Sequence, residues 1–141
     1  MRVFDSGATR DSDDSKIDYE GFLSPLVLER FGDFMHAHRL QSDGELRDSD
    51  NWQKGIPIYA YMKGLLRHVF AVWKMHRGYA AYDEKGIRVN IQDELCAVIF
   101  NAQGMLYELI QEELDMVPVK APEAVLFTPG TYHGGKSLPC D

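Results

Sequence analysis

The stretch PIYAYMKGLLRHVFAVWKMHR, Pro57 to Arg77, decides the fold class of this chain. Its apolar residues recur at steps of three and four, which is the spacing of one face of an α-helix. Gly78 follows directly, and glycine is the residue that most often ends a helix. The stretch therefore predicts a long amphipathic helix. Its stripe consists of Met62, Leu65, Leu66, Val69, Val72, Trp73 and His76.

Two further segments show the same period. SPLVLERFGDFMHAHR begins with Ser24 as a natural N-cap and Pro25 at the first helical position. A third helix is expected from about residue 91 to 115. The stripes are Val27, Phe31, Phe34 and Met35 in the earlier segment and Leu95, Val98, Ile99, Ala102, Leu106, Leu109 and Ile110 in the later one. Three long helices with almost no alternating pattern predict an all-α bundle, and the modest core that they offer favours a helical oligomer.

The chain divides into three parts. Residues 1–19 are polar and turn-rich and are expected to form an N-terminal arm. Residues 20–116 hold the helical patterns. Residues 117–141 contain four prolines and read as an irregular tail, whose apolar patch AVLFT could dock on the body or on a neighbouring subunit.

Composition limits the classes of function. A chain of 141 residues that is 45% hydrophobic and 26% charged is long enough for one globular domain. It has no apolar run of membrane length and no signal-like start, so we expect a cytoplasmic protein without a membrane partner. A net charge of −7 argues against binding to a nucleic acid backbone. Cys96 and Cys140 lack metal-ligand spacing.

Carboxylates recur on the first and third helices. Glu29, Asp33 and His36 share one face of the first helix. Two carboxylates one turn apart could share a divalent cation, or they could belong to a solvated face. On the third helix Asp93 shares an azimuth with the small residues Ala97 and Gly104, flanked by Glu94 and Asn101. That arrangement suits a ligand or the close packing of another helix.

The second helix carries basic residues outside its stripe. Arg67 could bind a phosphate through two hydrogen bonds, and His68 could donate to an oxyanion or form a structural hydrogen bond. The sequence ELRD, Glu45 to Asp48, has metal-motif spacing, but it lies in a turn-rich stretch where the two acidic side chains would not share a helix face, so it predicts no metal site.

The polar loop DSDNWQKGIP, Asp48 to Pro57, contains residues that a turn does not need. Trp52 could line a ligand site or close the end of the bundle. Asn51 could contact a ligand or fix the loop, while Lys54 could reach an anion or remain solvated. Gly55 and Pro57 would let a helix N-terminus approach an anion.

Four blocks in this order resemble a known family. They are GATRDSDDSKIDYEGFLSPLVLERF, HRLQSDGELRDSDNWQKGIP, LLRHVFAVWKMHRG and DELCAVIFNAQG, which span about residues 7 to 104. The combination is similar to phage dATP/dGTP diphosphohydrolases of the MazZ type, a MazG-like group associated with 2-aminoadenine genomes. The resemblance implies a metal-dependent, α-helical enzyme that cuts purine deoxynucleoside triphosphates into monophosphate and pyrophosphate, and that forms a homodimer or homotetramer.

The resemblance also suggests roles for individual residues. MazG-like enzymes usually carry Glu-Glu-x-x-Glu and a later Glu-x-x-Asp around magnesium, whereas this chain keeps only Glu29 and Asp33 of the first motif and has no faithful copy of the second. With Asp93 and Glu94 as substitutes, the expected Mg²⁺ or Mn²⁺ ligands are Glu29, Asp33, Asp93 and Glu94, of which Glu29, Asp33 and Asp93 would be catalytic. The expected substrate-binding residues are Arg10, Lys16, Asn51, Trp52, Lys54, Arg67, His68 and Asn101.

Two other classes remain open from the sequence. A nucleotide-binding module could retain the loop and the fold while having lost part of the metal cluster. A helical interaction protein could use the AVLFT patch to bind a protein partner and would have no affinity for nucleotides.

Overall fold

A computed structural model describes residues 1–116, and this part of the chain is mostly helical, as predicted. In chain order the elements are β1 (Arg2–Val3), β2 (Thr9–Arg10), α1 (Tyr19–Phe22), α2 (Pro25–Ala37), the 3-10 helix η1 (Asn51–Lys54), α3 (Ile58–His76) and α4 (Ile91–Met116). The predicted tail, residues 117–141, lies outside the described residues. Within residues 1–116, no helix combines the length and the apolar character needed to cross a membrane.

The helix boundaries follow from local chemistry. The Ser24 side chain accepts a hydrogen bond from the Val27 amide at 3.4 Å, and Pro25 occupies the first turn of α2. At the end of α3, Gly78 adopts a φ of +86°, a left-handed conformation that favours glycine. The Asn90 side chain accepts from the Asp93 amide at 2.8 Å and so begins α4.

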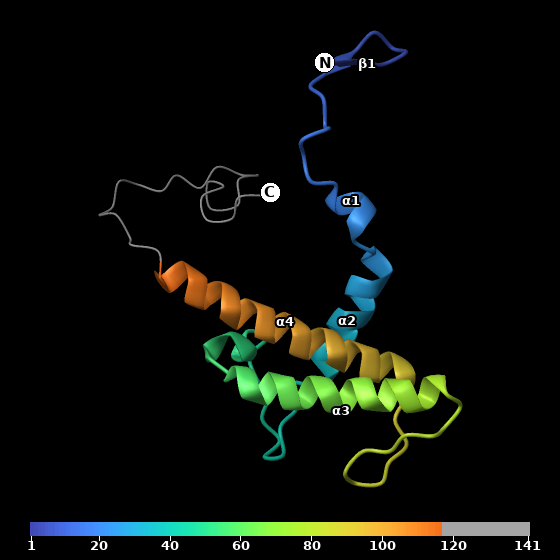
Figure 1. Cartoon of the computed structure of the whole chain (residues 1–141), viewed down its shortest axis with the longest axis vertical. Coiled ribbons are helices and arrows are strands. Elements are labelled where there is room, and N and C mark those ends of the chain that lie inside the picture. Colours follow the sequence, from blue (N-terminus) through green and yellow to red (C-terminus); the bar gives the residue numbers. More distant parts are fainter. Residues whose placement is uncertain (117–141) are drawn as a thin grey trace.

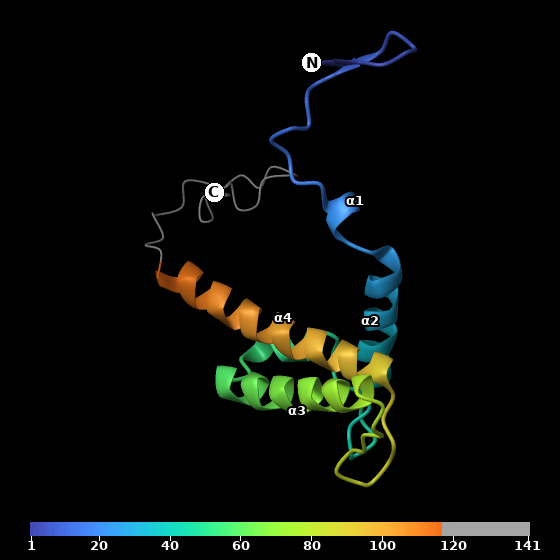
Figure 2. The same cartoon turned by 45° about the vertical axis from the view of Figure 1, so that its right-hand side comes forward.

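Helices α3 and α4 lie side by side and run in opposite directions, and they form the body of the molecule (Figure 1). The C-terminal half of α2 packs across the start of α4, while η1 lies against α4 farther along. The first half of α2, α1 and the β1–β2 hairpin stand away from this body in both views (Figures 1 and 2). The predicted arm is therefore partly ordered, because Arg2 pairs with Arg10 and Val3 with Thr9 in an antiparallel hairpin.

Two glycines allow α3 and α4 to approach closely. A Cβ atom at Gly104 would overlap the Tyr61 ring, and one at Gly64 would overlap the Asn101 side chain. Tyr61 is almost completely buried at 1% exposure. A second buried cluster joins α2 to α4 through Phe34, Cys96 and Ala97. The small residues of α4 thus mark helix packing along one side of the body.

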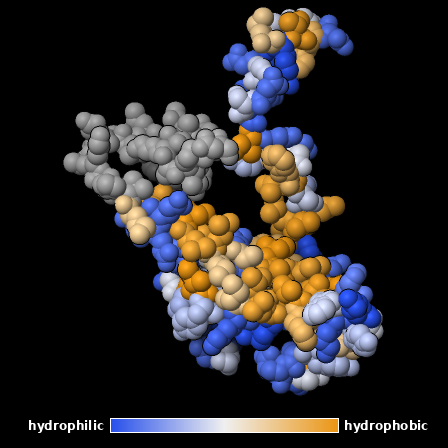
Figure 3. All heavy atoms as spheres, viewed as in Figure 1, coloured by the Kyte–Doolittle hydropathy of each residue, from blue (hydrophilic) through white to orange (hydrophobic). Residues whose placement is uncertain are grey.

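The described residues bury few large side chains and leave many apolar ones exposed. Leu66, Phe70 and Trp73 of α3 and Leu106 of α4 are all more than half exposed. Figure 3 shows apolar residues gathered on the visible face of the body and continuing over α2 and α1. An apolar face of this extent marks a surface for another molecule.

The glycine contact can be tested by substitution. We expect Gly104→Ala to lower the free energy of unfolding by about 1–3 kcal/mol, because the added methyl group must displace the Tyr61 ring. Gly32→Ala is the matched control, since Gly32 is also helical but has open space around its Cβ position. It should be neutral or raise stability by about 0.5–1 kcal/mol. Urea unfolding followed by circular dichroism measures both, and equal effects would contradict the packing described here.

Candidate functional site

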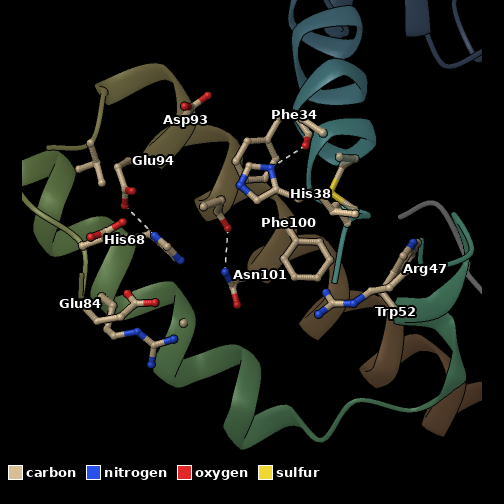
Figure 4. A pocket seen from close by; sticks show the side chains of 18 of the residues that line it. Phe34, His38, Arg47, Trp52, His68, Glu84, Asp93, Glu94, Phe100 and Asn101 are labelled. Atoms are coloured by element: carbon tan, nitrogen blue, oxygen red, sulfur yellow. Dashed lines mark hydrogen bonds and ion pairs between the residues drawn. The ribbon is translucent and has the colours of Figure 1, made fainter. Parts of the chain in front are cut away.

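A large open cavity of about 1230 Å³ lies between α3, α4, η1 and the loops that precede η1 and α4 (Figure 4). Residues far apart in the sequence meet on its walls. Of the residues singled out from the sequence, the cavity is lined by Asn51, Trp52, Arg67, His68, Asp93, Glu94 and Asn101.

A close side-chain contact between His68 and Glu94 forms one wall of the cavity. His68 Nδ1 lies 2.6 Å from Glu94 Oε2, and the pair joins α3 to α4. Glu94 is largely buried, whereas a third of the His68 side chain is exposed. Among residues 1–116, Glu94 Oε1 has no hydrogen-bond partner, so this oxygen is available to a ligand. The pair fixes the Glu94 carboxylate at the edge of the cavity.

Asp93 lies next to this pair but is already engaged by protein groups. Arg30 of α2 donates to Asp93 Oδ1 at 2.5 Å, and the Asn90 amide group donates to Asp93 Oδ2 at 2.9 Å. The hydrogen bond to Asp93 raises the pKa of the Arg30 guanidinium, which therefore stays charged. Asp93 thus holds α2 on α4, and a cation binding to Asp93 would compete with Arg30.

Asn101 lies near the middle of the cavity, between the His68–Glu94 pair and the aromatic end (Figure 4). Only 6% of Asn101 is exposed, and its Nδ2 donates to the Ala97 carbonyl at 2.8 Å. The side-chain oxygen packs against Gly64 of α3, where it fills the space that a Cβ atom would occupy. Asn101 is therefore held between the two helices at the wall of the cavity.

Trp52 forms the opposite end and is tied to the helical core. The Tyr61 hydroxyl donates to the Trp52 carbonyl at 3.1 Å. The Trp52 ring meets the Tyr107 ring edge-on, with the ring centres 4.9 Å apart. The loop tryptophan therefore both supports the end of the bundle and lines the cavity, so the two alternatives drawn from the sequence are compatible.

Several predicted site residues lie elsewhere. Glu29 and Asp33 are on the exposed side of α2 and do not line the cavity. Lys54 lies 3.3 Å from Asp48 but does not line the cavity either. Arg10 is on the projecting hairpin, and Lys16 pairs with Asp13 in the arm. In the described chain these five residues do not join the cavity residues.

Other cavity residues were not predicted. Arg47 and Phe100 lie near Trp52, and Glu84 lies on the side of His68 (Figure 4). Arg47 belongs to the ELRD stretch, for which the sequence predicts no functional role. It is positioned because its amide donates to the Arg39 carbonyl at 2.8 Å and Leu40 bridges Leu46. Isolated bridges of this kind leave no periodic signal in the sequence.

The side chains available as metal ligands limit how a metal ion could bind. Among residues 1–116, no three His, Cys, Asp or Glu side chains lie close enough together to hold one ion. The neighbouring carboxylates of Asp93 and Glu94 nevertheless line the cavity. Magnesium is commonly held by one or two carboxylates together with substrate phosphates and water. The described residues therefore fit an ion that arrives with a phosphate ligand better than one held by protein groups alone.

The hydrogen bond from Tyr61 to the Trp52 loop yields a test. We expect Tyr61→Phe to lower the free energy of unfolding by about 1 kcal/mol near neutral pH. Burial, with a further contribution from the negative charge of Glu108, raises the pKa of the Tyr61 phenol above 10.0. The stabilising effect of the protonated phenol is therefore complete below pH 10 and falls as the pH rises above 10, where the unfolded phenol ionises.

The difference in stability between the wild-type protein and Tyr61→Phe should accordingly narrow above pH 10. Urea unfolding at pH 8 and at pH 10.5 measures it. Tyr59→Phe is the control, because Tyr59 is 66% exposed, and it should change stability little at either pH. A pH-independent difference for Tyr61→Phe would show that the phenol ionises equally easily in the folded and unfolded chains.

No family model, no curated protein and no solved structure matches the chain. The assignment of a function therefore depends on the cavity and on the residues that line it.

Proposed function

We propose that the protein hydrolyses purine deoxynucleoside triphosphates, dGTP or dATP, to the monophosphate and pyrophosphate. One observation carries the proposal: a single cavity joins an aromatic end at Trp52 to a charged end at Arg67, His68 and Glu94. A nucleotide has the same division into a flat apolar base and a charged phosphate chain. In this proposal the fold is MazG-like, and the protein is a cytoplasmic homodimer or homotetramer that supplies dGMP for 2-aminoadenine synthesis in a phage-infected cell.

The aromatic end suits a purine. Trp52 and Phe100 offer ring surfaces, and stacking of a base on an aromatic side chain contributes about 1–3 kcal/mol. Asn101 would line the site between the base and the phosphates. Asn51, at the same end, would contact a base edge.

The charged end suits the triphosphate. Arg67 lines the cavity from α3, and Lys85 and Arg88 line it from the loop before α4. Fixed cations around phosphate oxygens stabilise the charge that builds up during phosphoryl transfer. In this proposal Lys85 and Arg88 bind the phosphates, a role that the sequence analysis had predicted for Lys54, Arg10 and Lys16.

Bound Mg²⁺ or Mn²⁺ would neutralise phosphate charge and lower the pKa of a water molecule. Glu94 is the residue that would hold the ion from the protein side, whereas Asp93 could join it only by releasing Arg30. His68 keeps the Glu94 carboxylate in place through its 2.6 Å contact. The water oxygen would bond to the α-phosphorus and give its proton to the Glu94 carboxylate, while the bond to the α–β bridging oxygen breaks and pyrophosphate leaves with the electron pair.

A second candidate is a nucleotide-binding module without turnover. It is favoured by the lack of a three-ligand acidic cluster within residues 1–116. The two candidates differ in a simple assay. Each dNTP is incubated with the protein and Mg²⁺ or Mn²⁺, and monophosphate and pyrophosphate are separated from diphosphate and phosphate. Release of pyrophosphate from purine substrates, abolished by a chelator, supports the enzyme, whereas nucleotide binding without products supports the module.

The role of Glu94 can be tested within the proposed enzyme. We expect Glu94→Gln to lower kcat at least about 100-fold, because the variant loses the carboxylate that faces the cavity. Glu113→Gln on the same helix is the control, since Glu113 is exposed and does not line the cavity, and its kcat should remain within about twofold. If the folded Glu94→Gln protein has the wild-type kcat, Glu94 takes no part in catalysis.

A further inference from the structure

Residues 18–29, here called the α1–α2 segment, are apolar and acidic and have little protein around them. Among the described elements, α1 contacts no other element. Phe22 is 78% exposed and Leu26 is 77% exposed, and Tyr19, Leu23, Val27 and Leu28 are more than half exposed. Both views show this part of the chain standing away from α3 and α4 (Figures 1 and 2). An isolated chain would keep this apolar segment in water.

The outer face of α3 is a second uncovered apolar surface on the same chain. It consists of Tyr59, Met62, Leu66, Val69, Phe70 and Trp73, all of them exposed. These residues recur at three- and four-residue steps on the side of α3 away from the buried Tyr61 and Gly64. A helix that is apolar on two sides is typical of a buried position. In the single chain, only the side of α3 that faces α4 is covered.

The two surfaces carry opposite charges. The α1–α2 segment contains Asp18, Glu20 and Glu29 and has no lysine or arginine. Residues 58–77 have no acidic residue and, apart from Arg67 in the cavity, contain Lys63, Lys74 and Arg77. Lys63 and Arg77 lie over the rings of Tyr59 and Trp73, so the positive charges border the apolar face itself. Complementary charges at the border of apolar surfaces orient a specific contact.

The α1–α2 segment and the outer face of α3 also offer similar apolar areas. At roughly 100 Å² for each half-exposed large apolar side chain, each surface offers roughly 600 Å². If two chains exchange segments around a two-fold axis, the contact buries up to roughly 2,400 Å² in total, above the roughly 1,600 Å² of a standard stable interface. A two-fold arrangement uses both surfaces of both chains and leaves neither exposed.

We infer that the α1–α2 segment of one chain packs on the outer face of α3 in a second copy, and that the second copy returns the same contact. Ser24 and Pro25 begin α2 in the middle of the segment. This inference specifies the interface of the oligomer in the proposed function. It does not depend on the proposed chemistry.

Cross-linking between two single-site variants tests the contact directly. One full-length chain carries Leu26→Cys and the other carries Phe70→Cys, both with Cys140→Ser and with different affinity tags; the native Cys96 is buried. After mixing and oxidation, we expect a disulfide between the two differently tagged chains. Val3→Cys in place of Leu26→Cys is the control, because Val3 is exposed on the distant hairpin, and it should give at least tenfold less product.

Other products would overturn the inference. Dominant Phe70–Phe70 cross-links would show that two α3 faces meet. In a chain that retains Cys140, an internal disulfide from Phe70→Cys to Cys140 would show that the tail covers α3. A disulfide within one chain carrying both Leu26→Cys and Phe70→Cys would place the segment on its own α3.

The molecular mass in solution gives a second test. By light scattering we expect a multimer for the wild-type protein and at least a halving of the mass for Phe22→Asp combined with Leu26→Asp. Val3→Asp should keep the wild-type mass. A monomeric wild-type protein overturns the inference. Pyrophosphate release, measured in the same samples, separates this outcome from failure of the proposed function. A monomer that still releases pyrophosphate would contradict the proposed interface but not the proposed reaction.

Discussion

The close contact between α3 and α4 is the constraint on which the rest of the structure depends. Gly64 and Gly104 remove two side chains from the helix interface, and Tyr61 and Asn101 fill the space. Tyr61 then reaches the loop that carries Trp52, while Asn101 lies in the cavity. The same packing aligns His68 of α3 with Glu94 of α4. One helix pair thus forms the core and also sets both ends of the candidate site.

The sequence was a good guide to the helices, because periodicity and capping are local. Ser24 and Pro25 marked the start of α2, and Gly78 marked the end of α3. It was a poorer guide to what each helix face meets. Glu29 and Asp33 do share a face, but Phe31, Phe34 and Met35 turn the opposite side of α2 toward the core. Spacing identifies neighbours on a helix, whereas the packing partner depends on distant residues.

The difference between local and distant signals also explains which residues of the cavity could be predicted from the sequence. Trp52 could be predicted because a polar loop has no local need for tryptophan, and His68 and Asn101 stood beside recognisable helical stripes. Arg47 and Glu84 could not, because they lie in turn-rich loops outside any periodic pattern. The loop of Arg47 is closed by a single bridge between Leu40 and Leu46, and the loop of Glu84 by one between Tyr82 and Arg88. Such bridges depend on where the surrounding helices bring the ends of the loop.

The hydrogen bond from Tyr61 to Trp52 links ligand binding in the cavity to the stability of the folded chain. A ligand that rests on Trp52 binds only where the loop is in place, and the loop is held by a residue of the α3–α4 core. Anything that binds the folded chain alone shifts the folding equilibrium by mass action, by about 2.7 kcal/mol at one hundred times its Kd. A nucleotide in this cavity would therefore protect the chain from heat and proteolysis even without being turned over.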